Sequence, residues 1–169
     1  MNIVSRMTSD WKAQFREVGV EVLRGVNISE LVYGSGCLLV GNCSRTKGRS
    51  GDAAIPKRFY KGENAQRVIT FAEYHGLPYG ILSDLYGIHF HDEALPYYDI
   101  HPSEVLDKAA LADTLRKKCE ERGIWRLVYS NTSPCRARFY LDLILMAGLQ
   151  VGYVTRLKRI RKGFGLCSE

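Results

Sequence analysis

Apolar residues recur along the chain with two spacings, one typical of helices and the other typical of buried strands. In the segment 9–23, Trp11, Phe15, Val18 and Val22 fall on one helical face. We therefore predict a helix there, starting at a cap at residue 9 or 10. Helical spacing, together with residues typical of helix starts and ends, predicts three more helices, at 63–75, 102–119 and 134–147.

Short apolar runs between the helical segments predict buried strands, at 37–40, 79–83, 124–129 and 151–157. The polar, basic run 41–61 predicts a long loop, and loops of that length are usually functional or mobile. Helices and strands therefore alternate. This order predicts an α/β fold, a three-layer sandwich with a mainly parallel sheet of at least four strands and helices on both faces.

The length of 169 residues suits a single domain, 1–169. Within it we distinguish an N-terminal helical segment (1–30), a central segment that carries the motifs below (36–102) and a basic C-terminal segment (153–169). The 46% hydrophobic content argues against wholesale disorder, and no apolar run is long enough to span a membrane. With no apolar leader and five scattered cysteines, the chain is expected in the cytoplasm with reduced thiols.

One cluster suggests a metal ligand set, because His89 and His91 would share a face of a strand and Asp92 and Glu93 follow them. The same residues also suit an exposed loop, and no third ligand lies at a fixed spacing. We therefore expect neither a metal nor a cofactor.

The net charge of +6 is concentrated in two segments. The segment 45–61 has six basic residues and one acidic residue, and the C-terminal segment adds five basic residues: Arg156, Lys158, Arg159, Arg161 and Lys162. Such blocks favour an anionic partner such as nucleic acid. Two alternatives stay open: a hydrated basic surface without a partner, and, for the C-terminal block, an edge strand whose charges discourage pairing.

Small polar residues follow three of the predicted strands. These strand ends read Asn42-Cys43-Ser44, Ser83-Asp84 and Ser130-Asn131-Thr132-Ser133. Ligands of open parallel sheets bind beyond the carboxyl ends of the strands, so the three ends together predict a binding pocket. Taken one at a time, the same residues are also good caps and turn formers.

Two motifs in this region resemble a known family. The first comprises Cys43-Ser44 after an apolar strand, then Lys47 and Phe59-Tyr60-Lys61, and the second comprises 81–88 (ILSDLYGI) and 96–99 (PYYD). Together they are similar to the uncharacterised domain family related to the peroxide-stress protein YaaA and to the core domain of archaeosine synthase. The sequence departs from the family at Arg45-Thr46, where a lysine is expected nearby more often than Arg-Thr. The resemblance implies an α/β domain tied to nucleic-acid or nucleobase biology, without supplying a reaction.

Three residues are candidates for catalysis. Cys43 would be a nucleophile if Lys47 or Arg45 stabilised its thiolate, and it would otherwise be a small buried residue. Lys47 would hold an anion or attack as an amine, or it would be a hydrated loop lysine. Asp99 would act as an acid or a base, or it would cap a nearby helix.

The remaining candidates would bind the ligand. Tyr86 would stack on a base or pack in the core, beside a turn in which Gly87 takes a positive φ. Ser83 would face the pocket or hold the end of its strand. The full set of binding candidates is Ser44, Tyr60, Ser83, Tyr86, Gly87, Tyr98, Ser130, Asn131 and Thr132.

From these observations we expect a protein that binds a nucleotide or a nucleic-acid base. As an enzyme, it would act on a nucleobase or on its glycosidic bond. The main alternative is a non-catalytic nucleic-acid-binding module that uses the two basic segments, and a weaker one is a small nucleotide sensor or hydrolase. The sequence does not determine the oligomeric state.

Overall fold

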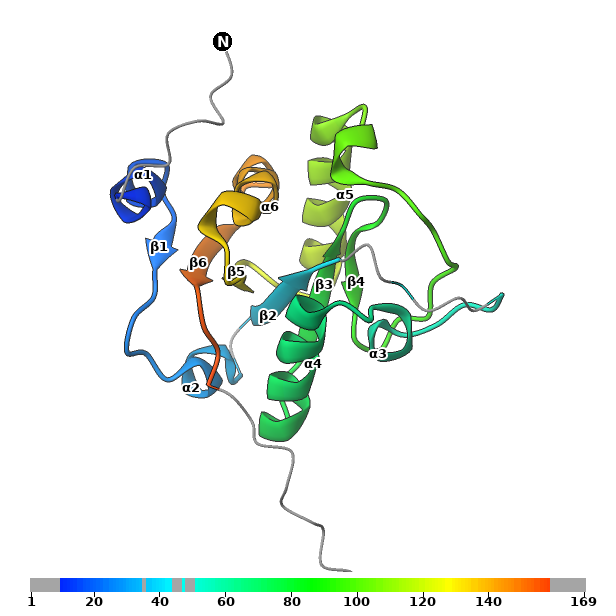
Figure 1. Ribbon diagram of the computed structural model, residues 1–169, viewed down its shortest axis with the longest axis horizontal. Coiled ribbons are helices and arrows are strands. Elements are labelled where there is room, and N and C mark those ends of the chain that lie inside the picture. Colours follow the sequence, from blue (N-terminus) through cyan, green and yellow to red (C-terminus); the bar gives the residue numbers. More distant parts are fainter. Residues whose placement is uncertain (1–9, 35, 44–46, 48–50, 159–169) are drawn as a thin grey trace, which may run out of the picture.

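In a computed structural model, which describes residues 10–34, 36–43, 47 and 51–158, a six-stranded sheet forms the centre of the molecule (Figure 1). The strands are β1 (Glu21–Val22), β2 (Cys37–Asn42), β3 (Tyr79–Ser83), β4 (Gly87–Phe90), β5 (Arg126–Ser130) and β6 (Gln150–Val154). Their order is β1-β6-β5-β2-β3-β4. Every pairing is parallel except that of β3 with β4. The predicted α/β class and mainly parallel sheet are therefore confirmed.

Helices connect the strands. They are α1 (Trp11–Glu17), α2 (Ile28–Val32), α3 (Pro56–Phe59), α4 (Glu63–His75), α5 (Lys108–Glu121) and α6 (Pro134–Met146), together with a 3₁₀ turn, η2 (Pro102–Glu104). Figure 1 shows α4 on one side of the central strands and α5 and α6 on the other. Among the described residues, no helix is long and apolar enough to cross a membrane.

The helices at 63–75 and 134–146 form where their local signals predict them. Gly76 ends α4 with a φ of 62°, a conformation that glycine adopts without strain. Ser133 begins α6 by accepting a hydrogen bond from the Arg136 backbone N–H at 3.4 Å, and Pro134 occupies the first helical position. The residues that set these boundaries lie within the helices or next to them, so the sequence predicts both helices closely.

The N-terminal helix is shorter than predicted. It ends at Glu17, Gly19 follows with a φ of 91°, and Val18 is 56% exposed. Residues 21 and 22 leave the helical path because they pair with β6 as strand β1. Helical periodicity beyond residue 17 was therefore a coincidence of spacing.

Four other parts of the chain also differ from the prediction. The helix expected from residue 102 is divided into η2 and α5, and α5 begins after Asp107, whose side chain accepts from the Ala110 N–H. The predicted loop 41–61 contains the end of β2 and the short helix α3. Strand β4 is not among the four strands predicted from the apolar runs, and β6 ends at Val154, three residues before the predicted end at residue 157.

The central strands are buried from both sides. All five residues of β3 and the first five of β2 are buried, which agrees with their nearly uninterrupted apolar sequences. The buried apolar side chains form one core. The carboxyl ends of the strands are therefore held on a rigid support.

Candidate functional site

The sheet topology brings the predicted strand ends together. Residues 39–42 of β2 pair with 79–82 of β3, and residues 37–40 pair with 126–129 of β5. Beyond β2, the backbone N–H of Cys43 donates to the Leu82 carbonyl oxygen at 2.8 Å. Helix α4 follows β2 on one face of the sheet, and α6 follows β5 on the other (Figure 1). The connections that leave these two neighbouring strands therefore run to opposite faces. Open α/β sheets bind ligands at such a divergence.

A compact triangle of polar groups lies at the end of β2. The Cys43 thiol donates to Asp84 Oδ2 at 3.1 Å, and the Tyr140 hydroxyl donates to Asp84 Oδ1 at 2.6 Å. The third side of the triangle is a 3.1 Å contact between Cys43 Sγ and the Tyr140 hydroxyl. All three residues are buried. Asp84 therefore has a hydrogen-bond partner on each of its carboxyl oxygens.

Burial raises the pKa of two groups in this triangle, Cys43 and Asp84. It raises the pKa of the Cys43 thiol to about 11, and the Asp84 carboxylate adds to the shift. The thiol form therefore predominates at neutral pH, which is the opposite of the thiolate stabilisation that a cysteine nucleophile needs. Burial also raises the pKa of Asp84, although its hydrogen bonds and the positive charges of Lys47 and His101 oppose that shift.

Lys47 lies beside this triangle as an enclosed amine. Its side chain is only 2% exposed, and Nζ lies 4.6 Å from the centroid of the Tyr98 ring. Asp99 Oδ1 is 4.0 Å from Nζ, but the Asp99 side chain is 77% exposed. The structure brings three of the candidates, Lys47, Tyr98 and Asp99, close together and places Asp99 at the surface of the cluster. At this distance the face of the Tyr98 ring attracts a cation.

A chain of hydroxyl groups extends away from Lys47. The Ser83 hydroxyl donates to the Tyr98 hydroxyl at 2.8 Å, and the Tyr98 and Tyr60 hydroxyls lie 3.3 Å apart. Tyr60 in turn contacts His89 Nδ1 at 3.2 Å, and His89 Nε2 contacts the Glu93 carbonyl oxygen at 2.6 Å. Burial lowers the pKa of His89, which favours its neutral form.

Tyr86 packs against neighbouring residues of the protein, and Gly87 follows it in the turn between β3 and β4. The Tyr86 hydroxyl donates to the Pro96 carbonyl oxygen at 3.0 Å, and its ring meets the Tyr98 ring edge-on at a centroid distance of 5.3 Å. Gly87 has the predicted positive φ, at 70°. Ser83 stabilises this turn by accepting from the Tyr86 N–H at 3.0 Å. Of the two interpretations of Tyr86, the contacts favour packing.

A second polar cluster joins β2 and β5. Asn42 Oδ1 accepts hydrogen bonds from the Tyr129 hydroxyl and from the side-chain amides of Asn64 and Asn131. Asn64 also donates to the Ser130 carbonyl oxygen at 3.2 Å. In this cluster Ser130 and Asn131 hold the strand ends together.

Sequence reasoning missed several residues of the site. Asn42, Asp84 and Tyr140 were not among the candidates, although Asp84 directly follows Ser83 at a predicted strand end. Tyr140 lies three residues after Ala137 in the helix predicted at 134–147, a spacing that places both side chains on one side of the helix, and that spacing was the available signal.

Of the remaining candidates, the structure describes three. Thr132, Arg156 and Lys158 are exposed. Ser44, Arg159, Arg161 and Lys162 lie outside the described residues. Within the described ranges, no group of three or more His, Cys, Asp or Glu residues could hold a metal ion.

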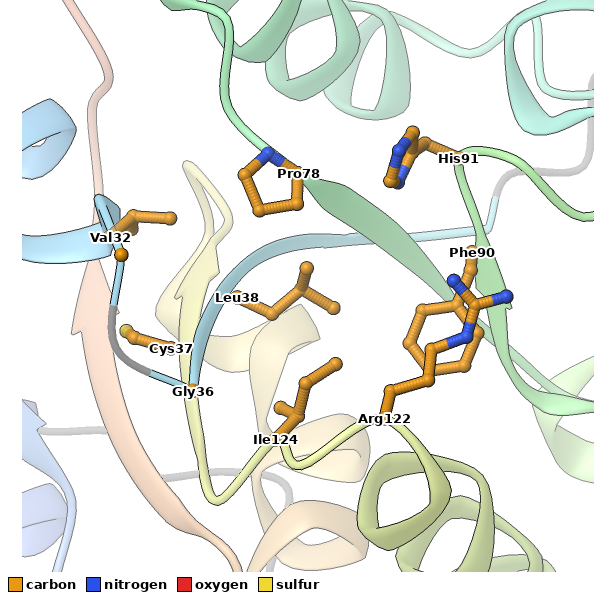
Figure 2. A pocket seen from close by; sticks show the side chains of 10 residues that line it. Val32, Gly36, Cys37, Leu38, Pro78, Phe90, His91, Arg122 and Ile124 are labelled. Atoms are coloured by element: carbon orange, nitrogen blue, oxygen red, sulfur yellow. The ribbon is translucent and has the colours of Figure 1, made fainter.

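A hollow of about 460 Å³ lies at the opposite edge of the sheet, where β2 begins (Figure 2). Figure 2 shows Leu38 at its centre, with Phe90 and Arg122 close together on one side. The guanidinium carbon of Arg122 lies 4.0 Å from the Phe90 ring centroid, and Arg122 also pairs with Asp92 at 2.7 Å. The lining of this hollow is mainly apolar, and Arg122 in that lining is already paired with Asp92. The lining contains none of the predicted site residues.

Comparisons with known protein families, with curated proteins and with solved structures found no match for this chain.

Replacing Asp84 by asparagine is expected to change how stability depends on pH. Because burial raises the folded-state pKa of Asp84 above its ordinary 3.8, the folded protein binds this proton more tightly than the unfolded chain does. The wild-type free energy of unfolding therefore falls as the pH rises from the ordinary pKa through the folded pKa. The Asp84→Asn variant does not titrate there, so it should gain stability relative to wild type over that interval.

Urea unfolding at a series of pH values from about 4 to 7 measures the difference between the two proteins. The same series on an Asp52→Asn variant, which changes an exposed aspartate, controls for titration at the surface. A difference between Asp84→Asn and wild type that is constant over this range would contradict the raised pKa.

Proposed function

We propose that the protein binds a nucleobase or nucleotide at the carboxyl edge of β2 and β3, beside Lys47. The observation that carries the proposal is the enclosed Lys47 amine, which lies near a buried carboxyl group, Asp84, at the edge where α/β sheets bind ligands. The resemblance of the Cys43-to-Lys47 and 81–88 motifs to the YaaA-related family supports the same ligand class.

The chemistry of the cluster suits a flat, polar ligand. A lysine ammonium group donates to carbonyl oxygens or ring nitrogens of a base, and it attracts the negative charge of a phosphate. The Tyr98 hydroxyl accepts from Ser83, and a hydroxyl group can both donate and accept, so it can adapt to different base edges. The expected three-layer arrangement and cytoplasmic location remain predictions that accompany this proposal.

A catalytic version of the proposal assigns different roles from those expected at first. Lys47 would hold an anion or attack as an amine, while Cys43 would stay a thiol. Asp84 fits the acid–base role better than Asp99 does, because Asp84 is buried in the cluster and burial raises the pKa of its carboxyl group, whereas Asp99 is mostly exposed. Such an enzyme would act on a nucleobase or on its glycosidic bond.

Calorimetric titration with free bases and uncharged nucleosides tests the binding proposal. These ligands have no phosphate, so attraction to the basic segments does not contribute. Lys47→Met retains most of the aliphatic stem but removes the charge, and it is expected to weaken binding by at least about tenfold, the loss of one charge-assisted hydrogen bond. Lys57→Met is the matched control, because Lys57 is 56% exposed and pairs with Glu73 at the surface.

Two results would overturn the proposal. One is the absence of saturable binding of every base and nucleoside to the folded wild type. The other is equal affinity of wild type and Lys47→Met, both shown to be folded by circular dichroism. Release of free base from a nucleoside, followed by chromatography, separates the catalytic version from simple binding, and it should be lost in Asp84→Asn.

A further inference from the structure

A second hollow, larger than the one in Figure 2, lies between the end of β6, the β1–α2 connection and the C-terminal half of α4. Its volume is about 710 Å³, and its lining consists of 23–29, Phe71, His75 and 154–158. This volume is within the range of ligand pockets, roughly 300–1,000 Å³. It contains none of the residues of the Lys47 site.

The lining of this hollow is positively charged. Arg24, Arg156 and Lys158 contribute three cations, and among the residues that the structure describes no aspartate or glutamate lines the hollow. None of the three forms an ion pair with any part of the chain that the structure describes. By contrast, Arg122 at the other hollow is paired with Asp92. Three such cations around one concave site attract an anion with more than one negative charge.

The rest of the wall is largely apolar. Leu23, Ile28, Phe71 and Val154 are buried and line the hollow, and Leu157 adds a half-buried side chain. The side chains of Asn27 and Ser29 supply polar atoms and hydrogen-bond to each other at 2.7 Å. A ligand that fits both parts of this wall has a phosphate group and an apolar or aromatic portion.

We propose that this hollow binds the phosphate group of an organic phosphate, through Arg24, Arg156 and Lys158, while the organic portion packs against the apolar wall. The proposal does not depend on the proposed nucleobase site. The phosphate belongs either to a small phosphate ester or to a nucleic-acid chain, since both present the same group to the three cations.

The experiment compares phenyl phosphate, inorganic phosphate and phenol as ligands of the 169-residue chain, and ¹H–¹⁵N correlation spectra follow the binding. Phenyl phosphate is expected to bind most tightly, inorganic phosphate more weakly and phenol weakest. Amide shifts should concentrate in 23–29 and 154–158. Raising the salt concentration should weaken the binding of both phosphates.

Two variants test the charge and the shape separately. The triple variant Arg24→Gln/Arg156→Gln/Lys158→Gln should weaken binding of phenyl phosphate at least about tenfold. The control triple Arg16→Gln/Lys117→Gln/Arg138→Gln changes the net charge equally at exposed positions outside the hollow and should bind as wild type does. Ser29→Phe keeps all three cations but fills the hollow, and it should lose the preference for phenyl phosphate over inorganic phosphate.

A short single-stranded oligonucleotide distinguishes the two sources of the phosphate. If it displaces phenyl phosphate with a steep salt dependence, the hollow binds nucleic acid, and if it does not displace phenyl phosphate, the ligand is a small ester. Equal losses in the two triple variants, or binding of phenol as tight as that of phenyl phosphate, would overturn the proposal. A Lys47→Met variant that binds phenyl phosphate normally shows that this site is separate from the proposed nucleobase site.

Discussion

Replacing Asn42 by leucine is expected to lower the free energy of unfolding by roughly 3–5 kcal/mol, because three buried or half-buried donors then lose one acceptor. Tyr129 and the side-chain amides of Asn64 and Asn131 all donate to Asn42 Oδ1, at 3.1, 2.9 and 2.9 Å. Leucine has a similar volume, so the loss reflects unsatisfied polar groups rather than a cavity.

Denaturant unfolding measures this loss, and Asn64→Ala provides the comparison. Asn64 is half-buried and supplies only one of the donors in the cluster, so its replacement should cost only about 1 kcal/mol. If Asn42→Leu costs no more than Asn64→Ala, the shared acceptor does not hold β2 to β5 as the geometry indicates. The Asn42→Leu variant should also weaken any ligand binding at the carboxyl edge, because Asn42 directly precedes Cys43.

The parts of the fold that sequence predicts best are those with local signals. Helix α4 and strand β3 follow each other with Gly76 between them, so each boundary is set within a few residues. Strand β1 is different, because residues 21 and 22 form a strand only through pairing with residues 152 and 153 of β6. Nothing near residue 21 encodes that partner, and the local helical spacing favours the wrong element.

The same distinction applies to the site. The polar strand ends are visible in sequence, and parallel-sheet topology places them at one edge. Tyr140, however, reaches Asp84 from a helix 56 positions later, and only the packing of α6 on the sheet determines that contact. The protonation of Cys43 is set by burial at the same place, so no neighbouring residue in the sequence predicts that its pKa rises to about 11.

Replacing Gly87 by alanine is expected to cost roughly 2–4 kcal/mol of stability, from two separate causes. The φ of 70° is strained for any residue with a Cβ, which costs about 1–2 kcal/mol. A Cβ at this position would also lie 3.0 Å from the Leu115 backbone nitrogen and 3.1 Å from its Cα. These atoms belong to the middle of α5, so the helix itself must move to relieve the contact.

Gly123→Ala separates the two causes, because Gly123 has nearly the same φ, 66°, and a Cβ added there would meet no atom within 4 Å. It should therefore show the backbone cost alone, about 1–2 kcal/mol. The excess in Gly87→Ala then measures how closely α5 packs on the β3–β4 turn. That packing matters to the site, since the turn also contains Tyr86, whose ring supports Tyr98 beside Lys47. Equal unfolding free energies for the two variants would show that α5 yields without cost, and the site would then lack the rigid support on which the proposed binding depends.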